Sequence, residues 1–336
     1  MCIDTRDSLV EHLQWALMVE LSTIPPYLCA LYSIPDGSNA TSAHLIRSVV
    51  MEEMLHMTLV ANLMNAIGAK PCLNKAKWVP KYPTYLPHSD DSFCVHLLPF
   101  SKKAIETFLK IERPAPADAP PQPHGFSTIG QFYEAIKEGF EIVAENDEHL
   151  FDGKPENQVT GETWYYGGGG EPIRVRDLAS AKHALAEIAE QGEGLDHTIF
   201  DSDHAFFDQD EELAHYFKFK EIQLGRRYTG EDTPKSGPSG PELPVDWDAV
   251  YPMKPDPKAE NYTDRPEVHA LMTDFNEAYT KLLKTLHKAY NGKPHLLGEA
   301  VPEMYALKYK AQELMRIPTG DDDGTTVGPP FEFVGR

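Results

Sequence analysis

The feature that most constrains the fold is a pair of long helical repeats near the start of the chain. Leucine, isoleucine and alanine recur three or four positions apart over about residues 7–32, and again over about residues 42–67. A Pro-Asp-Gly-Ser turn at 35–38 separates the two stretches. Long helices joined by a short polar loop pack as an antiparallel hairpin. The sequence therefore predicts a helical bundle, in which Pro25-Pro26 kinks or breaks the first helix because proline lacks an amide proton.

The remaining periodic stretches predict further helices and a division into two regions. Helical spacing recurs at about 101–111, 128–148, 177–197, 208–224, 265–290 and 302–315, and a short strand is expected at 94–98. The proline-rich segment 71–127 is interpreted as a surface insertion. We expect residues 5–228 to form the bundle with this insertion, and residues 229–336 to form a linker and a C-terminal helical pair packed on the same bundle.

The charge balance argues against some partners. The chain carries 52 Asp and Glu against 31 Lys and Arg, a formal net charge of -21. Nucleic acids and anionic membranes bind clustered cations, so neither is expected as a partner. No stretch reaches the roughly 18 apolar residues of a membrane-spanning helix. The first residues lack the pattern of a secretory signal, and the four cysteines form no Cys-x-x-Cys pair. The sequence therefore predicts a cytoplasmic protein.

Two Glu-x-x-His pairs are the strongest chemical signal. Glu53 and His56 lie in the second helical stretch, and Glu212 and His215 lie in the stretch at 208–224. This spacing places a carboxylate and an imidazole on one side of a helix, where both reach one metal ion. With 29 Glu and 14 His in the chain, one such pair is expected by chance, so the surroundings decide. Both pairs lie among apolar residues, where unpaired carboxylates are costly unless a cation compensates them.

A further glutamate precedes the first pair. Glu20 stands alone in the apolar stretch Ala-Leu-Met-Val-Glu-Leu at 16–21. Glu20 and Glu53 lie at nearly equal distances from the turn at 35–38, so an antiparallel hairpin brings them level. The first half of a metal site is therefore expected from these two helices.

The glutamate that precedes the second pair has more than one candidate. Measured from a turn near 202–204, Glu193 matches the depth of Glu212 best, and Glu190 lies one helical turn further back. We favour Glu193, keep Glu190 as a near-equal alternative, and assign Glu187 to the surface. The chain then supplies Glu, Glu-x-x-His, Glu and Glu-x-x-His in that order, which is the ligand order of ferritin-like di-iron carboxylate bundles.

Several stretches resemble a known family. They are Glu20-Leu-Ser-Thr-Ile-Pro-Pro-Tyr27, Met51-Glu-Glu-Met-Leu-His56, Gln191-Gly-Glu-Gly194 and Leu213-Ala-His-Tyr-Phe-Lys-Phe219. Together they resemble the ferritin-like domain of iminophenyl-pyruvate dimer synthases, which occurs in violacein and indolocarbazole pathways. The similarity runs from about residue 5 to 316. It implies an all-α, ferritin-like four-helix bundle with a proline-rich insertion and extra C-terminal helices, as a stand-alone member of the family.

The ligand set and the resemblance together predict two metal ions. Carboxylate and imidazole ligands suit Fe(II) or Mn(II), and no thiolate belongs to the set. We expect iron, with manganese as the alternative. The expected ligands are Glu20 and His56 on one ion, Glu193 (or Glu190) and His215 on the other, and Glu53 and Glu212 as bridges.

The resemblance implies a non-haem metal oxidoreductase or oxygenase of secondary metabolism. Its partners would be dioxygen or peroxide and a small organic metabolite derived from an amino acid or indole. The alternative is a ferroxidase or iron-handling protein without an organic substrate. A metal-free helical scaffold is a third reading, which the scarcity of Lys and Arg near the proposed ligands disfavours. The sequence leaves open whether the protein forms a homo-oligomer.

Overall fold

The computed structural model describes residues 3–163, 169–194, 198–201 and 212–335, which form eight α-helices and no β-strand. The predicted all-α fold is confirmed. The helices are α1 (Arg6–Ser33), α2 (Ala40–Ala66), α3 (Lys102–Ile111), α4 (Ile129–Asn146), α5 (Leu178–Glu193), α6 (His215–Leu224), α7 (Pro266–Ala289) and α8 (Leu297–Leu314). None of the described helices combines the length and the apolarity that crossing a membrane requires.

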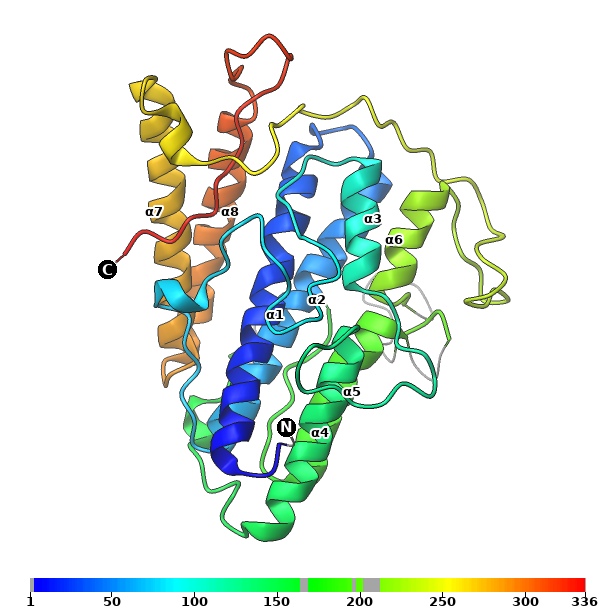
Figure 1. The fold of residues 1–336 in the computed structure, drawn as a ribbon, viewed down its shortest axis with the longest axis vertical. Coiled ribbons are helices and arrows are strands. Elements are labelled where there is room, and N and C mark those ends of the chain that lie inside the picture. Colours follow the sequence, from blue (N-terminus) through cyan, green and yellow to red (C-terminus); the bar gives the residue numbers. More distant parts are fainter. Residues whose placement is uncertain (1–2, 164–168, 195–197, 202–211, 336) are drawn as a thin grey trace.

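The predicted hairpin of α1 and α2 forms the centre of the molecule (Figure 1), and α1 continues through both of its prolines. Pro25 and Pro26 lie inside α1, which ends at Ser33, so the predicted break does not occur. Pro26 leaves the carbonyl of Ser22 without its usual amide donor. The hydroxyl of Tyr82 donates to that carbonyl at 2.8 Å. A side chain from the proline-rich segment thus replaces one of the missing helical hydrogen bonds.

The other half of the bundle consists of two short helix pairs placed end to end. α4 packs against α5 and α1, whereas α3 packs against α6 and α1. Figure 1 shows α3 and α6 above α4 and α5, beside the same central hairpin. The third and fourth positions of a four-helix bundle are therefore each filled by two helices with a break between them. The ends of these short helices at the break face the middle of α1 and α2.

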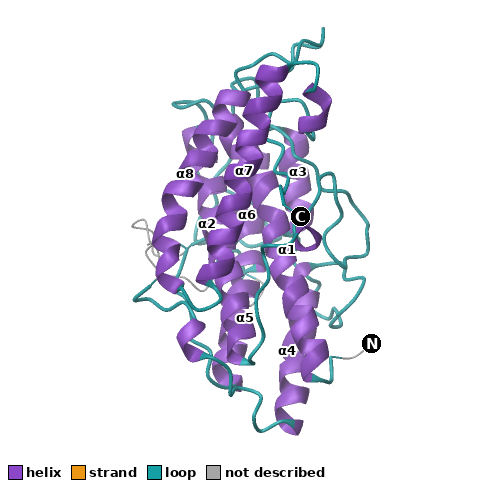
Figure 2. Cartoon of the chain, turned by 90° about the vertical axis from the view of Figure 1, so that its left-hand side faces the viewer, coloured by secondary structure: helices purple, strands orange, loops and turns teal. Residues whose placement is uncertain are grey.

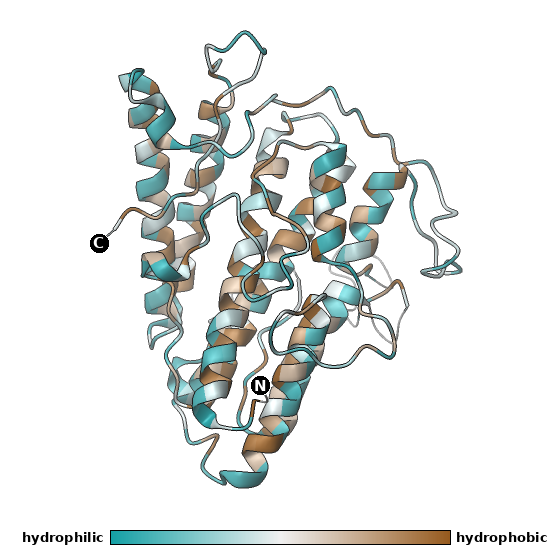
Figure 3. Ribbon diagram, viewed as in Figure 1, coloured by the Kyte–Doolittle hydropathy of each residue, from teal (hydrophilic) through white to brown (hydrophobic). Residues whose placement is uncertain are grey.

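A further hairpin, α7 and α8, flanks the bundle and contacts α1 through α8. Figure 2 shows both helices running alongside the central pair. α7 is amphipathic, with Met272, Phe275 and Tyr279 among its buried residues. Figure 3 shows hydrophobic and hydrophilic residues alternating along the helices, as amphipathic helices do. The division into a bundle at 5–228 and a C-terminal region at 229–336 stays a prediction.

The predicted strand at 94–98 does not form among the described residues. Val95 and Thr84 make only an isolated antiparallel bridge. A strand needs several paired residues to satisfy its backbone groups, and the prolines around this segment remove donors. The proline-rich segment instead supplies α3, which buries Ala104, Ile105 and Phe108 against the bundle.

Two predicted helices are shorter than expected on either side of the break. The helix expected over 177–197 ends at Glu193, because Gly194 takes a φ of 99° and ends the helical hydrogen bonding. Residues 195–197 lie outside the described part of the chain. The helix expected over 208–224 begins at His215, because Leu213 bridges Phe200 in extended conformation. The start of that prediction, 208–211, also lies outside the described residues.

Candidate metal centre

Buried carboxylates and imidazoles converge at the break between the short helix pairs. Two groups of side chains each place their ligand atoms within 4.8 Å of one another. The first group is Glu20, Glu53 and His56, and the second is Glu53, Glu112 and His215. All five residues are buried. Glu53 belongs to both groups, so the two groups share one carboxylate.

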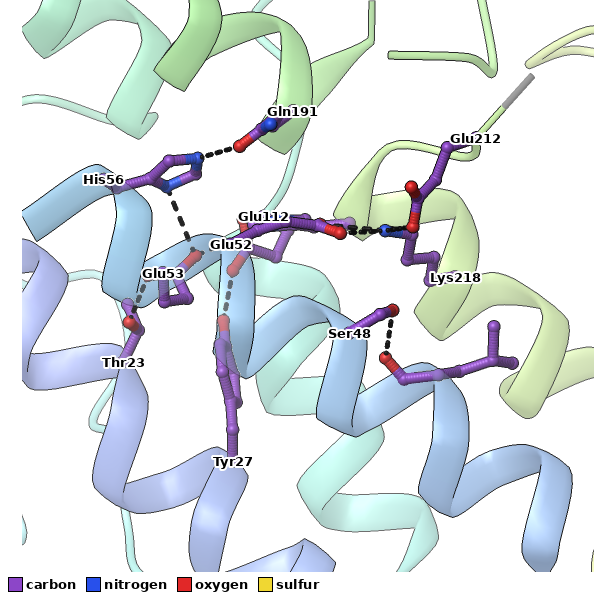
Figure 4. Close-up of polar contacts among 12 residues, drawn as sticks. Thr23, Tyr27, Ser48, Glu52, Glu53, His56, Glu112, Gln191, Glu212 and Lys218 are labelled. Carbon is purple, nitrogen blue, oxygen red and sulfur yellow. Dashed lines mark hydrogen bonds and ion pairs between the residues drawn. The ribbon is translucent and has the colours of Figure 1, made fainter. Parts of the chain in front are cut away.

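The first group comes from the two long helices. Nδ1 of His56 lies 3.3 Å from Oε2 of Glu20 and 3.7 Å from Oε1 of Glu53. The other ring nitrogen, Nε2, lies 2.8 Å from Oε1 of Gln191 on α5 (Figure 4). A metal-binding histidine usually donates its second ring N–H to such an acceptor, which fixes the orientation of the ring. His56 therefore presents Nδ1 to the carboxylates, while Gln191 fixes the ring through its Nε2.

The second group comes from the ends of short helices. Nδ1 of His215 lies 3.1 Å from Oε1 of Glu53 and 3.4 Å from Oε2 of Glu112. Its Nε2 lies 2.7 Å from Oε2 of Glu52. The rings of His56 and His215 stack with their centroids 5.4 Å apart. Both imidazoles thus turn Nδ1 towards the shared carboxylate and Nε2 away from it.

Hydroxyl groups surround the three carboxylates of the centre. The Tyr27 hydroxyl donates to Glu112, and the Tyr133 hydroxyl donates to Glu20. Thr23 Oγ1 donates to Oε2 of Glu53 at 2.5 Å (Figure 4). Burial, together with the adjacent carboxylate, raises the pKa of both tyrosines well above the usual range. The tyrosines therefore remain neutral donors that fix the position of the carboxylates.

The charge of the centre is unbalanced. No lysine or arginine of the described residues forms an ion pair with Glu20, Glu53 or Glu112, whose only partners of this kind are the two histidines. Burial, and then the neighbouring Glu112 and Glu20, raises the pKa of Glu53 to about 7. An isolated buried charge costs several kcal/mol, so the group either takes up protons or binds cations.

A buried ion pair lies on the Nε2 side of His215, away from the shared carboxylate. Nζ of Lys218 lies 2.7 Å from Oε1 of Glu52 and 2.8 Å from Oε1 of Glu212 (Figure 4). Burial alone would raise the pKa of Glu52, but Lys218 and His215 together lower it to about 2. Glu52 is therefore ionised at neutral pH and attracts the Nε2 side of the imidazole. Lys218 thus keeps Glu52 ionised, and Glu52 holds the candidate ligand His215 in place.

The donor set fits a pair of metal ions. Both ring nitrogens of His215 are buried without a hydrogen bond of standard geometry, although carboxylate oxygens lie close to them. Burial would lower the pKa of His215, but the carboxylates of Glu112, Glu52 and Glu53 raise it well above the usual range, so in the metal-free protein the imidazole holds a proton where a metal ion would bind. Two divalent cations would also offset the three carboxylates. Oxygen and imidazole donors without thiolate suit iron or manganese.

Four of the residues predicted from the sequence meet at this centre, and three do not join either group. Glu20, Glu53, His56 and His215 converge as described. Glu212 precedes α6 and pairs with Lys218, so the second Glu-x-x-His pair does not lie on one helix. Glu190 is half-buried on α5 and belongs to neither group.

Glu193, the favoured fourth glutamate, lies beside the centre but is held by backbone amides. Its two carboxylate oxygens accept from the amides of Ala115 and Gly130, each at 2.9 Å. A Cβ at Gly130 would lie 2.3 Å from Oε1 of Glu193, so only glycine permits this contact. Burial, partly offset by the two amides, raises the pKa of Glu193 to about 7.

Glu112 is the residue that the sequence prediction missed. It is the C-terminal cap of α3, directly after Ile111 in the segment interpreted as a surface insertion. An anionic side chain at a helix C-terminus is repelled by the helix dipole. A lone glutamate at the end of an amphipathic helix is therefore a signal that another partner stabilises the charge there.

A small cavity of about 20 Å³ borders the centre. Its walls include Glu20, Glu112 and Glu193 together with the apolar side chains of Ile129 and Ile188. This volume holds roughly one water-sized molecule. The apolar part of the wall limits the access of bulk water to the carboxylates.

Comparison with known proteins places this fold in a family. The family model described as Ferritin-like matches residues 13–224. Dichlorochromopyrrolate synthase of Lentzea aerocolonigenes is 24% identical over 98% of this chain, and 2-imino-3-(indol-3-yl)propanoate dimerase of Chromobacterium violaceum is 25% identical over 98%. The chain spans only 36% and 34% of the length of these two relatives.

A solved structure shows the same fold. The crystal structure of a ferritin-like protein from Caulobacter vibrioides superimposes with a TM-score of 0.66 at 22% identity, covering 96% of this chain and 97% of that one. The resemblance inferred from the sequence motifs is confirmed by the family model and the two curated relatives. This chain belongs to the ferritin-like family.

Proposed function

We propose that this protein is a non-haem dinuclear metal oxidoreductase that acts on a small organic metabolite, with iron as its metal. One observation carries the proposal: two ligand groups share Glu53, and no lysine or arginine of the described residues neutralises their carboxylates. Glu20 and His56 would hold one ion, Glu112 and His215 the other, and Glu53 would bridge them. Iron bound there would supply redox chemistry with dioxygen or peroxide.

The residues around the ligands would keep the site rigid and dry. Tyr27, Tyr133 and Thr23 donate to the three carboxylates and so fix the oxygens that face the ions. Gln191 and Glu52 orient the two imidazoles from behind. Such supporting contacts typically contribute a factor of about 10–100 to metal affinity. Glu193 lines the cavity, where a small molecule beside the ligands would meet its carboxylate.

The names of the two relatives suggest the substrate class. One is a synthase of dichlorochromopyrrolate and the other a dimerase of 2-imino-3-(indol-3-yl)propanoate. We propose a metabolite derived from an amino acid, of the indole type, as the substrate of this chain.

Metal loading tests the proposal. The purified protein, loaded anaerobically with Fe(II) and freed of excess metal, is expected to retain about two iron ions per chain. Glu53→Ala should lose both ions, because it removes the shared ligand, whereas Glu134→Ala should lose neither. Glu134 is the control, since it is an exposed glutamate that pairs with Lys137. Less than one iron ion per chain, unchanged in Glu53→Ala and His56→Ala, would contradict the proposal.

A ferroxidase is the second candidate, and the size of the cavity favours it. A volume of about 20 Å³ admits a water-sized molecule but not an indole. Under this alternative, Fe(II) itself is the substrate, and the protein oxidises many equivalents of iron into a mineral in a large homo-oligomer. Turnover that stops after about one oxidation per site, together with consumption of an added indole substrate, would favour the oxidoreductase. Mineral formation would favour the ferroxidase.

A further inference from the structure

A second cavity, much larger than the one beside the metal centre, lies between the α1–α2 hairpin and the α7–α8 hairpin. Its volume is about 480 Å³, within the range of about 300–1,000 Å³ that is typical of small-molecule sites. The two cavities share no lining residue. Met54 and Met57 line the large cavity, whereas Glu53 and His56, their neighbours in α2, belong to the metal centre. The two sites therefore lie on opposite faces of the same hairpin.

The large cavity is elongated along the helices. Leu21 and Leu31, both in α1, contribute to its wall. At 1.5 Å of rise per residue these positions lie about 15 Å apart. Two of its lining residues, Leu283 and Phe331, are each 1% exposed, so this part of the wall is buried. An elongated space with a buried wall fits an extended chain better than the flat surface of a protein.

The inner part of the cavity is mostly apolar and adaptable. Leucines from α1, α7 and α8 line it, the Tyr290 hydroxyl is hydrogen-bonded to Thr58 at 2.9 Å, and the buried Tyr279 hydroxyl has no hydrogen-bond partner among the described residues. Met51, Met54 and Met304 also contribute side chains. Unbranched methionines adjust to chains of different length. The inner wall therefore favours a hydrocarbon.

Two cations line the cavity on the side towards the α1–α2 turn. Lys308 lies beside Asp36 of that turn, and Arg47 lies about two helical turns into α2. Arg47 is exposed and forms no ion pair with any described residue, and the Lys308–Asp36 pair spans 3.5 Å with Asp36 81% exposed. An exposed pair of this kind contributes little. Two cations against one carboxylate make a local positive surplus in a chain with a net charge of -21.

We propose that this cavity binds a long-chain carboxylate, with its hydrocarbon chain along α1 and α2 and its carboxylate between Arg47 and Lys308. The two cations select the anion, and the mostly apolar interior selects the chain. The metal centre takes no part in this binding, so the proposal stands apart from the proposed function.

Calorimetric titration of the metal-free protein with dodecanoate tests the proposal. We expect saturable binding of about one ligand per chain. Dodecylamine, with the same chain and the opposite charge, should bind at least about tenfold more weakly, and so should indole-3-acetate, with the same charge and a short planar body. Equal binding of the amine, or no saturable binding of dodecanoate, would overturn the proposal.

Two variants locate the ligand. Arg47→Gln should weaken dodecanoate binding about tenfold, whereas Arg174→Gln, at an exposed arginine outside the cavity, should leave it unchanged. Met54→Trp should block the interior, whereas Met18→Trp, at a half-buried methionine outside the cavity, should not. Circular dichroism establishes that each variant is folded.

Further outcomes would overturn the assignment. If His56→Ala abolishes dodecanoate binding, the ligand occupies the metal centre and not this cavity. If the wild type is a dimer that Met54→Trp dissociates in sedimentation experiments, a second copy of the chain covers the cavity. Retained metal content in Arg47→Gln and Met54→Trp separates failure of this proposal from failure of the proposed metal centre.

Discussion

The two halves of the candidate centre are built differently, although they present the same kinds of ligand. Glu20, Glu53 and His56 come from the interior of α1 and α2, where regular backbone fixes their relative positions. Glu112 and His215 come from the last and first positions of short helices that meet at a break in the bundle. Helix geometry therefore sets the positions of the ligands in the first half, whereas the packing of helix ends sets them in the second.

The largest expected effect is on metal content. It tests which residues form the second half of the centre. Glu112→Gln should reduce the metal content from about two ions per chain to about one, because it removes a carboxylate that only the second group uses. Glu193→Gln and Glu212→Gln are matched controls that should retain both ions, since their carboxylates already contact backbone amides or Lys218. Elemental analysis of the three variants decides the matter. Loss of metal in Glu193→Gln with full occupancy in Glu112→Gln would reverse the assignment.

The next largest effect is on stability. It concerns Lys218, the buried cation beside the second half of the centre. Lys218→Met should destabilise the protein by about 3–5 kcal/mol, because it leaves Glu52 buried without its partner. Lys220→Met, two residues further along α6 and partly exposed, should cost much less. Urea denaturation measures both. The double variant Glu52→Gln/Lys218→Met should recover part of the loss, and a single variant as stable as the wild type would contradict this role.

The shared carboxylate predicts a pH dependence of the metal-free protein. Burial raises the pKa of Glu53 to about 7 from the usual 4.5 of a glutamate, so the folded state binds its proton more tightly than the unfolded state does. Its stabilising contribution is present below pH 4.5 and is lost as the pH rises through about 7.

Glu53→Gln is the variant that exposes this dependence. It should raise the melting temperature of the metal-free protein at pH 8, where the loss in the wild type is complete, and raise it less at pH 5. The corresponding gain in the free energy of unfolding at pH 8 is on the order of 1–3 kcal/mol. Scanning calorimetry at both pH values measures it. An equal or larger gain at pH 5 would show that Glu53 does not carry the effect.

The smallest expected effects compare the tyrosines of the two halves. Tyr133→Phe removes the donor to Glu20, and Tyr27→Phe removes the donor to Glu112. Each should weaken metal binding by about tenfold, because a hydrogen bond to a charged group contributes about 1.5–3 kcal/mol. Competition with a metal chelator measures the affinity of each variant. A loss confined to Tyr133→Phe would mean that Glu112 is not a ligand.

The sequence predicted the first half because its geometry is local. Helical spacing sets Glu53 and His56 on one side of a helix, and the short turn at 35–38 brings Glu20 level with them. The number of helices and the α1–α2 hairpin followed from the same periodicity. The two prolines do not break α1, and Tyr82 satisfies one freed carbonyl from a distant part of the chain.

The second half could not be predicted in the same way, because its geometry is not local. Glu112 lies in a segment without extended periodicity, and its position depends on how α3 packs against α1 and α6. Glu212 matches the helical motif in sequence, but the bridge between Phe200 and Leu213 keeps it out of α6. A motif of four residues does not reveal whether its first residue is helical. Tertiary pairing decides that.

A crystal structure of the iron-loaded protein, with anomalous scattering measured at the iron edge, tests the central claim most directly. We expect two anomalous peaks at the break between the short helix pairs, both bound to Glu53. One should also be bound to Glu20 and His56, and the other to Glu112 and His215. A single peak, or a second ion held by Glu193 or Glu212 in place of Glu112, would contradict the account.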